Sequence, residues 1–253
     1  MAAVRVLSWN LQGSAGLDAD AVAAVVGRAA PDLFLAQEVQ RGQSRRLASA
    51  CRFRSCRWAF KHWPIVHRAE GMAVLSPHRL SAATAFVLHH SFPWSWRRRV
   101  AIEATVLIDA RPVRVINAHL SPHDAPDRRR EEIDRVIERR GVVAPIVGGD
   151  LNDRPGGPAR TRLAEAGWTD AWAAVHLGAG TPEPAGGDDA PLDPGATNWT
   201  VGDRVGRPPT QRIDAVFVPD GWTVRSCEVV TDPRPLLAAM SDHLPVVADV
   251  EHG

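Results

Sequence analysis

Nine short apolar runs recur along this chain of 253 residues, and they constrain its fold more than any other feature. They are rich in Val, Ile, Leu and Phe and are bounded by turn residues. The runs cover 4–11, 32–39, 71–76, 100–108, 112–120, 142–151, 212–218, 223–230 and 245–251. Several are apolar on both alternations, which is typical of strands buried on both faces. The sequence therefore predicts sheets that are covered on each side.

Three stretches between these runs have the spacing and boundaries of helices. The first, 17–30, starts with acidic cap candidates and stops at Pro31. The second, 125–141, mixes charges at helical spacing and ends at Gly141, and the third is 157–167. Helices follow some strands and hairpin-like pairs occur elsewhere. This mixed order predicts an α/β protein with two packed sheets flanked by helices.

The chain length allows one large domain or two small ones. One low-complexity stretch, 178–197, is rich in Gly, Pro and Asp, which is typical of a functional loop or a disordered insertion. Because the strand pattern resumes directly after it, we interpret residues 1–253 as a single domain.

Composition narrows the function classes only modestly. The net charge is +1, so nucleic-acid affinity would have to come from a local patch. The three cysteines favour neither a disulfide framework nor a zinc site. The N-terminus resembles a first strand rather than a signal peptide, and no apolar run is long enough to span a membrane. These features predict a cytoplasmic, monomeric protein without an obligate protein partner.

Polar residues follow or interrupt six of the apolar runs, where a buried strand would not choose them. They are Asn10, Gln37, Glu38, Asn117, His119, Asp150, Asn152, Asp214, Asp242 and His243. Any one of them alone is more often a cap or a turn group. Buried carboxylates, however, are costly unless they are paired or bind metal. If the strand ends converge, the cluster predicts a hard-oxygen site for Mg²⁺ or Mn²⁺ beside imidazoles that transfer protons.

The segment GGDLND at 148–153 belongs to this pattern. Its glycines let the backbone approach another group closely, and its acids and amide suit a divalent cation or an ordered water. The alternative is an ordinary turn at the end of a strand.

Six motifs in this order resemble the signature series of the endonuclease/exonuclease/phosphatase superfamily. They are SWNLQG, LAQEV, NAHLSP, GGDLND, RIDAVFV and SDHLPV, and they extend from residue 8 to residue 247. Each motif alone is weak, but the ordered series is specific. The resemblance implies a four-layer α/β/β/α sandwich and hydrolysis of a phosphoester.

The resemblance also implies roles for the polar residues. Glu38 would be the principal metal ligand, with Asn10 beside it. Asp150 would position and deprotonate the attacking water, and Asn152 would hold the phosphate. The reaction would be a single in-line displacement by water, because no activated nucleophile accompanies the motifs.

Further roles follow for residues near the end of the chain. His243 would donate to a phosphoryl oxygen, with Asp242 orienting its ring and within reach of the metal. His119 would stabilise the transition state or assist the leaving group, and Asp214 would be a support residue or a second-metal ligand.

Two additional positions match the family pattern less specifically. Glu70 resembles an acid that supports the histidine at position 119, although a surface acid is the alternative. Arg99 resembles a phosphate-facing arginine, but the neighbouring Arg97 and Arg98 leave the inward-facing residue open. Asp153 and the histidines at 62, 67, 89, 90 and 123 are interpreted as structural or solvated.

The substrate is less constrained than the reaction. The chain has no tyrosine, whereas abasic-site endonucleases usually place one near the position of His119. The stretches 41–63 and 89–99 combine arginines with aromatics, which favours a nucleic acid, DNA or RNA. The alternatives are a small phosphoester or a phospholipid head group, and, more remotely, a catalytically dead binding module.

Overall fold

The computed structural model describes residues 3–62, 69–90, 98–122, 124–177, 193, 195–199, 204 and 207–253. For His62 and His90 it describes the backbone only. Most of the low-complexity stretch 178–197 lies outside the described residues. So do His67, His123, Arg97 and the other residues of 91–97.

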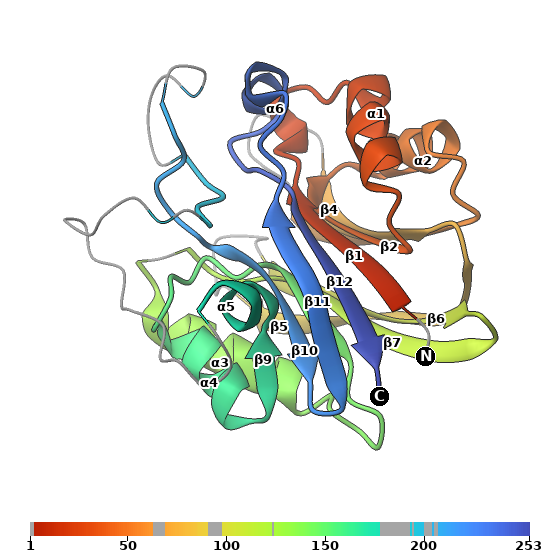
Figure 1. Cartoon of the computed structure of the whole chain (residues 1–253). Coiled ribbons are helices and arrows are strands. Elements are labelled where there is room, and N and C mark those ends of the chain that lie inside the picture. Colours follow the sequence, from red (N-terminus) through yellow and green to blue (C-terminus); the bar gives the residue numbers. More distant parts are fainter. Residues whose placement is uncertain are drawn as a thin grey trace.

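Two six-stranded mixed sheets form the centre of the molecule (Figure 1). Sheet A has the order β11-β12-β1-β2-β4-β3 and sheet B the order β5-β6-β7-β8-β10-β9. The strands of sheet A are β1 (Ala3–Asn10), β2 (Leu33–Val39), β3 (Ser55–His62), β4 (Glu70–Ser76), β11 (Trp222–Val229) and β12 (Val246–His252). The strands of sheet B are β5 (Arg79–His90), β6 (Arg98–Ile108), β7 (Arg111–His119), β8 (Ile146–Asp150), β9 (Trp168–Asp170) and β10 (Asp214–Pro219).

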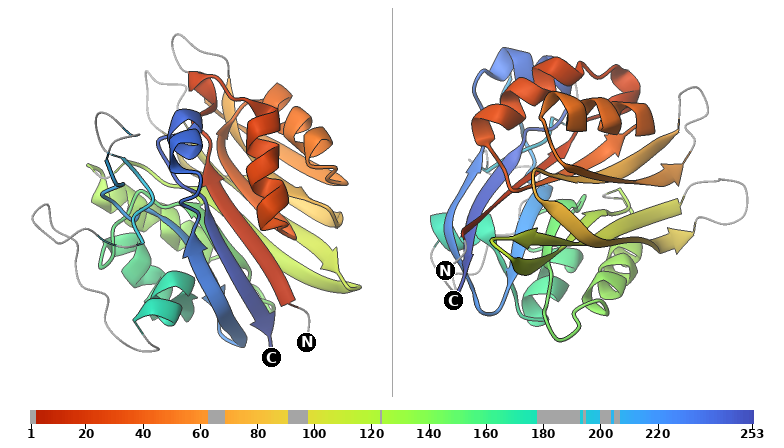
Figure 2. Two further views of the ribbon diagram at one scale, coloured as in Figure 1. Left: turned by 45° about the horizontal axis from the view of Figure 1, so that its top comes forward. Right: turned by 90° about the vertical axis from the view of Figure 1, so that its right-hand side faces the viewer.

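Helices lie against the outer faces of both sheets (Figures 1 and 2). On the sheet A side are α1 (Ala19–Ala29), α2 (Arg41–Ala50) and α6 (Arg234–Met240). A short 3₁₀ turn, η1 (Gly13–Ala15), precedes α1. On the sheet B side are α3 (Pro126–Ile137) and α4 (Pro158–Glu165), while α5 (Ala171–His176) packs beside β9, β10 and β11. The predicted four-layer α/β/β/α sandwich is therefore confirmed.

Three apolar clusters hold these layers together. The largest lies between the sheets, where side chains such as Leu35 and Val216 are buried. The other two join each sheet to its own helices, through residues such as Val25 on α1 and Ile133 on α3. Because each sheet packs against a layer on either face, its strands are apolar on both alternations.

All nine predicted strands and all three predicted helices are present, with shifted ends. The helix predicted to end at Gly141 ends at Ile137. Among the strands, the largest shift concerns the run 142–151, because β8 begins only at Ile146. Val142 is fully exposed and Pro145, which has no backbone N–H to donate to a ladder, precedes the strand. The predicted start of this strand was therefore wrong.

The short glycine pair in β8 brings the two sheets close together beside the strand end. A Cβ on Gly148 would lie 2.7 Å from Cδ1 of Leu35 in the facing sheet. Gly149 has φ +144° and a Cβ there would lie 1.8 Å from the carbonyl oxygen of Ala118. Both observations explain why this strand ends in two glycines before its acid.

We expect Gly149→Ala to destabilise the fold by about 3 kcal/mol, because it adds both backbone strain and a steric conflict with β7. Gly16→Ala is the matched control, since Gly16 has φ +100° but no atom within 4 Å of the added Cβ. That variant should lose about 1 kcal/mol. Urea unfolding at constant m-value measures both. Equal losses would show that close approach to β7 is not what requires glycine.

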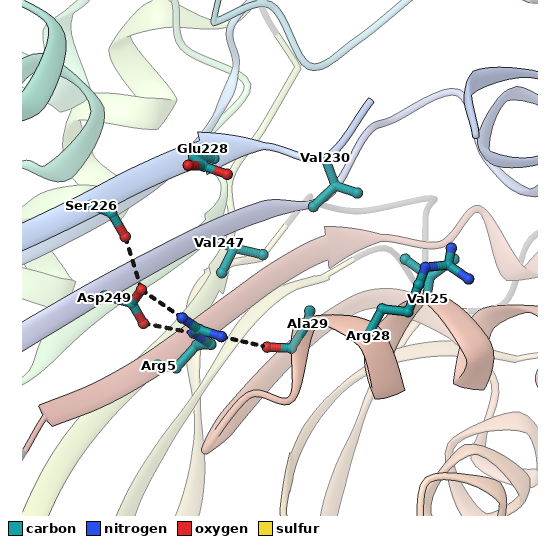
Figure 3. A pocket seen from close by; sticks show the side chains of 9 residues that line it. All are labelled: Arg5, Val25, Arg28, Ala29, Ser226, Glu228, Val230, Val247 and Asp249. Carbon is teal, nitrogen blue, oxygen red and sulfur yellow. Dashed lines mark hydrogen bonds and ion pairs between the residues drawn. The ribbon is translucent and has the colours of Figure 1, made fainter. Parts of the chain in front are cut away.

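A separate groove of about 280 Å³ lies between α1 and the outer face of sheet A (Figure 3). Inside it, the Arg5 guanidinium contacts both carboxylate oxygens of Asp249, at 2.6 and 2.8 Å. Ser226 donates to the same carboxylate. These charged groups in the groove therefore satisfy one another.

Among the helices of the described residues, none is long and apolar enough to cross a membrane.

Candidate active site

The polar strand ends converge at one edge of the sandwich. His119 on β7 is the lateral neighbour of Asp150 on β8, and Asp150 is the lateral neighbour of Asp214 on β10. From the facing sheet, Asn10 at the end of β1 donates through Nδ2 to Oδ2 of Asp150 at 3.0 Å. Two sheets therefore deliver their polar ends to one carboxylate.

Asp150 is the centre of this cluster and is buried. Its Oδ1 accepts a hydrogen bond from the backbone N–H of Asn152 at 2.9 Å. Its Oδ2 lies 3.5 Å from Nε2 of His119 and 3.8 Å from Nε2 of His243. The carboxylate is thus held in one orientation, with an imidazole nitrogen on each side.

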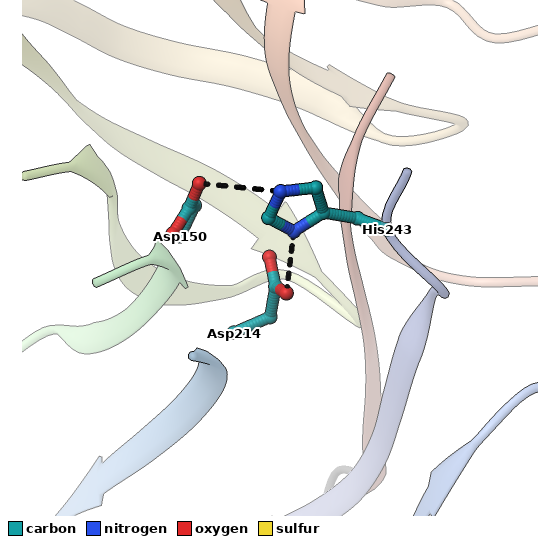
Figure 4. Close-up of side chains that lie close together, drawn as sticks. All are labelled: Asp150, Asp214 and His243. Atoms are coloured by element: carbon teal, nitrogen blue, oxygen red, sulfur yellow. Dashed lines mark hydrogen bonds and ion pairs between the residues drawn. The ribbon is translucent and has the colours of Figure 1, made fainter. Parts of the chain in front are cut away.

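His243 is oriented by Asp214 rather than by Asp242 (Figure 4). Nδ1 of His243 lies 2.8 Å from Oδ2 of Asp214. Asp242 instead accepts a hydrogen bond through Oδ2 from Gln12 at 3.1 Å. The interpretation that Asp242 orients the ring was wrong. The physical reason is position. Asp214 begins β10 and contacts the ring, whereas Asp242 contacts Gln12 in the loop after β1.

Glu38 reaches the site from an irregular point in β2. The pairing of β2 with β4 shifts between Ala36 and Val39, which indicates a β-bulge, and Glu38 itself has φ +52°. Bulges redirect side chains and are frequent beside active sites, and a non-glycine residue with positive φ is strained. The Glu38 side chain remains 25% exposed, so it borders both the cluster and solvent.

Lys61, the only lysine in the chain, is a site residue that the sequence motifs did not indicate. It lies at the end of β3 and is fully enclosed, 2% exposed. Its Nζ is 3.4 Å from Oε1 of Glu38 and 3.1 Å from Nδ1 of His119. A charged ammonium at Nδ1 leaves the ring proton on Nε2, directed at Asp150. The signal available in the sequence was a lone lysine in an arginine-rich segment that precedes the Glu70-Gly71 pair.

Asn198 is a second residue that the motifs missed. Its backbone bridges Gln211 on one side and His243 on the other, and its Nδ2 lies 2.9 Å from Nε2 of His243. The same Nδ2 donates to the carbonyl oxygen of Asp242 at 3.2 Å. In the sequence, Asn198 directly follows the low-complexity stretch 178–197, and the composition of that stretch did not indicate a site residue.

A buried amide pair connects the two sheets beneath the site. Asn117 donates through Nδ2 to the carbonyl oxygens of Ala36 at 3.0 Å and Ala73 at 2.9 Å, next to the bulge. Gln37 donates to Oδ1 of Asn117 at 2.8 Å. These bonds satisfy carbonyl groups that the irregular ladder exposes, and they fix the sheets relative to each other.

The remaining predicted residues lie around this centre. Asn152 has φ +48° and donates through Nδ2 to the carbonyl oxygen of Leu120 at 3.1 Å. The charge of Arg99 contributes to lowering the pKa of both Glu38 and Lys61, whereas Arg98 donates to the backbone of β3. Glu70 is buried and raises the pKa of Lys61. The roles assigned to Asn152, Arg99 and Glu70 stay predictions.

Asp153 has the structural role that was expected. It is buried, and its Oδ2 accepts from the backbone N–H of Ala159 at 2.7 Å, at the start of α4. Arg129 donates to its Oδ1 at 3.1 Å. His89 is half-buried on β5, opposite Arg99.

Burial and neighbouring charge shift the pKa values of the central groups in different directions. Burial raises the pKa of Asp150 to about 6. Burial lowers the pKa of Lys61 to about 8. Burial disfavours the charged ring of His243, but Asp214 and Asp150 outweigh it and raise its pKa to about 10. Burial also opposes ionisation of Glu38, yet Lys61 and His243 hold its pKa below the ordinary value.

The donor set fits a divalent cation. Ligand atoms of Asp150, Asp214 and His243 lie within 4.8 Å of one another. Oδ1 of Asp214 is a buried carboxylate oxygen without a hydrogen-bond partner among the described residues. Glu38 lies outside this group, on the far side of His119, whose Nε2 is 3.9 Å from Oε1 of Glu38 and 3.5 Å from Oδ2 of Asp150. No cysteine belongs to the group. Oxygen donors of this kind suit Mg²⁺ or Mn²⁺ better than a thiophilic metal.

Comparison with known families decides the relationship that the motifs suggested. The model of the Endonuclease/Exonuclease/phosphatase family matches residues 7–243. The chain belongs to this family. Endonucleases, exonucleases and phosphatases all hydrolyse phosphoester bonds, so membership supports a phosphoester hydrolase. No curated protein sequence matches the chain.

Solved structures agree with the fold of this family member. A family protein from Beutenbergia cavernae has a TM-score of 0.78 at 24% identity, covering 100% of this chain and 72% of the other. The human Nocturnin catalytic domain, solved with a sulfate anion, has a TM-score of 0.72 at 18% identity, covering 99% of this chain and 95% of the other. A mannosyl-6-phosphatase from Bacteroides thetaiotaomicron has a TM-score of 0.73 at 17% identity, covering 98% of this chain and 99% of the other. At these identities the likeness shows the fold alone.

We expect Lys61→Met to lower kcat about a hundred-fold on a chromogenic phosphodiester, because Glu38 and His119 lose the cation between them. The Met side chain fills the space without a charge. Arg46→Met on the exposed face of α2 is the control and should leave kcat on this small substrate unchanged. A kcat within two-fold of the unmodified protein would exclude Lys61 from the chemistry.

Proposed function

We propose that this family member is a Mg²⁺- or Mn²⁺-dependent phosphodiesterase that uses an Asp-activated water and acts on nucleic acid. One observation carries the proposal most directly. Asp150 is a buried carboxylate with a raised pKa, fixed by Asn10 and flanked by two imidazoles. This arrangement suits a general base at a reacting phosphorus.

Glu38 and Asn10 are the proposed metal ligands, and Asp242 is a further candidate. A bound divalent cation would supply positive charge next to a phosphoryl oxygen. The lowered pKa of Glu38 keeps this carboxylate ionised, as a ligand must be. Asp214 is the proposed support residue, with one oxygen on His243 and the other without a hydrogen-bond partner in the described part of the chain.

Asp150 would accept the proton of the attacking water. A pKa raised to about 6 makes it a stronger base than an ordinary carboxylate while leaving it mostly ionised near neutral pH. Its hydrogen bonds from Asn10 and from the N–H of Asn152 hold the lone pairs in place. The water is thereby oriented for in-line attack on phosphorus.

The two histidines would act on the other side of the reaction. The raised pKa of His243 favours the charged ring, with Nδ1 on Asp214. Nε2 could then donate to a phosphoryl oxygen after the Nδ2 of Asn198, itself a donor 2.9 Å away, turns aside. His119 would present its Nε2 proton to the transition state or to the leaving oxygen, with Lys61 at Nδ1. Asn152 would hold the phosphate.

Nucleic acid is the favoured substrate because cations surround the site. Lys61 and Arg99 lie beside Glu38, and the segment that follows Glu38 is rich in arginine. The sulfate bound to Nocturnin is an anion with the tetrahedral shape of phosphate. The second candidate is a small phosphoester, the substrate class that the name mannosyl-6-phosphatase indicates for one structural relative.

The experiment uses metal-free protein and five substrates: single-stranded DNA, double-stranded DNA, RNA, a chromogenic diester and a monoester. Each is assayed with Mg²⁺, with Mn²⁺ and with EDTA. We expect metal-dependent cleavage of a nucleic acid. Turnover of only the diester or monoester would move the substrate to a small phosphoester or a lipid head group. Absence of turnover on every substrate would contradict the proposal and favour a binding module.

A further inference from the structure

One interval of the chain carries several positive charges and no acid. No Asp or Glu occurs between Glu38 and Glu70, although the chain has 29 acidic residues. Within this interval, six arginines are exposed on α2, on β3 and on the turn between them. They are Arg41, Arg45, Arg46, Arg52, Arg54 and Arg57, here called the α2–β3 arginine surface.

No acid pairs with any of these six arginines among the described residues. Some arginines elsewhere do form salt bridges with acids. Arg5 pairs with Asp249 and Arg225 with Glu251. Unpaired exposed cations add their fields instead of cancelling, and they attract polyanions. The absence of acids distinguishes this interval from other arginine-rich segments such as α3, where Asp127, Glu131 and Asp134 accompany the arginines.

The arginine surface joins the candidate active site at both of its ends. α2 begins three residues after Glu38, and β3 ends at His62, one residue after Lys61. β3 is also the edge strand of sheet A, so no further strand covers it among the described residues. α2 lies on the outside of the molecule next to α1 (Figures 1 and 2).

The dimensions of this surface exceed those of a single phosphoester. A ten-residue helix is about 15 Å long, and eight residues of strand extend about 26 Å. Phosphates along one strand of B-form duplex recur about every 3.4 Å of axis. A substrate with one phosphate at the reacting centre would not reach these arginines, but several successive backbone phosphates would.

We propose that the α2–β3 arginine surface binds the sugar-phosphate backbone of a nucleic acid beyond the bond that is cleaved. The inference rests on the proposed function, because it assigns the remote part of that same substrate. The surface makes contacts with phosphate charge rather than with bases. It therefore contributes affinity and positioning without sequence preference.

An anionic membrane is the competing polyanion, and the composition of the surface argues against it. Stable binding of a protein to a lipid surface needs apolar side chains that enter the acyl region as well as basic residues. Among the described residues, the exposed large apolar side chains are Val142, Val143, Val175 and Leu236. None of them belongs to α2 or β3.

The test compares two triple variants with equal loss of charge. Arg45→Gln, Arg46→Gln and Arg57→Gln neutralise the proposed surface. Arg128→Gln, Arg130→Gln and Arg135→Gln neutralise exposed arginines on α3, on the opposite outer layer. Binding of a fluorescent 20-nucleotide single strand is measured by anisotropy in EDTA, over a range of KCl concentrations. Turnover of the chromogenic diester with Mg²⁺ reports separately on the reacting centre.

We expect the α2–β3 triple to weaken oligonucleotide binding at least ten-fold and to reduce the slope of log K against log salt by about 2. The α3 triple should change binding less than two-fold, and neither should alter diester turnover. Equal losses in the two triples, or none, would overturn the proposal. Binding of phosphatidylserine vesicles to the same variants is measured in parallel. If the α2–β3 triple lost binding only to these vesicles, the proposal would also be overturned. If oligonucleotide binding is lost as expected but nothing is hydrolysed, the surface stands and the proposed function fails.

Discussion

Asp150→Asn is expected to lower kcat for phosphodiester hydrolysis about a thousand-fold, with a small change in KM. The amide keeps the size of the side chain, but its single oxygen can accept from only one of the two donors, Asn10 and the N–H of Asn152. It cannot take a proton from water. General-base catalysis contributes about a hundred- to ten-thousand-fold to rates. Asp150 has the raised pKa that suits a general base, so we expect a loss of rate within that range. Steady-state kinetics on the chromogenic diester measures the effect.

The control for this variant is its own stability. Removing a buried charge offsets part of the one hydrogen bond that the amide loses, so the free energy of unfolding should change by less than about 2 kcal/mol. Loss of kcat together with normal unfolding assigns the residue to chemistry. A decrease of less than ten-fold in kcat would mean that another group activates the water.

Asp214→Asn is expected to lower kcat about a hundred- to ten-thousand-fold, because His243 loses the carboxylate at Nδ1 that fixes its ring and its charge. The matched control is Asp242→Asn at saturating Mg²⁺, which should lose less than ten-fold, since Asp242 contacts Gln12 and not the ring. Kinetics on the same diester compares the two. A larger loss in the Asp242 variant would restore the original sequence-based assignment.

The ¹⁵N chemical shifts of His243 give a readout that a change in stability would not produce. With Asp214 present, the proton on Nδ1 is held at all pH values where the ring pairs with the carboxylate. In the Asn variant we expect the Nδ1 and Nε2 forms to interconvert. Unchanged shifts would show that Asp214 does not select the tautomer.

The layers of the fold were predictable because strands buried on both faces need apolar residues at every position. That requirement makes runs such as 100–108 visible in the sequence. α2 was missed because its buried face consists of Gln43, Ser44 and Leu47, and only one of these is apolar. β5 was missed because it lies at the edge of sheet B and carries many small side chains. Periodicity indicates an element only when burial demands apolar residues.

The convergence of the site residues was predictable to a large part for a related reason. Buried acids such as Asp150 and Asp214 need partners, so their presence in apolar strands indicated a cluster. The pairing within the cluster was not predictable. Whether Asp214 or Asp242 contacts His243 depends on the register of β8 and β10, which sequence patterns do not specify.

Lys61 illustrates what motif spacing cannot provide. It belongs to an edge strand outside the apolar runs, and it reaches Glu38 and His119 only because β3 pairs with β4 beside the bulge. Asn198 is similar, since a bridge to His243 places it. The single domain, the monomeric state and the cytoplasmic location stay predictions.

The most direct measurement is a Mg²⁺ titration of diester hydrolysis, starting from protein freed of divalent ions, for the unmodified chain and for Glu38→Gln. The account predicts no hydrolysis without metal and saturable activation by Mg²⁺. It also predicts that Glu38→Gln needs at least ten-fold more Mg²⁺ or fails to recover. Hydrolysis at the full rate in metal-free buffer, or identical titrations of the two proteins, would contradict the central claim.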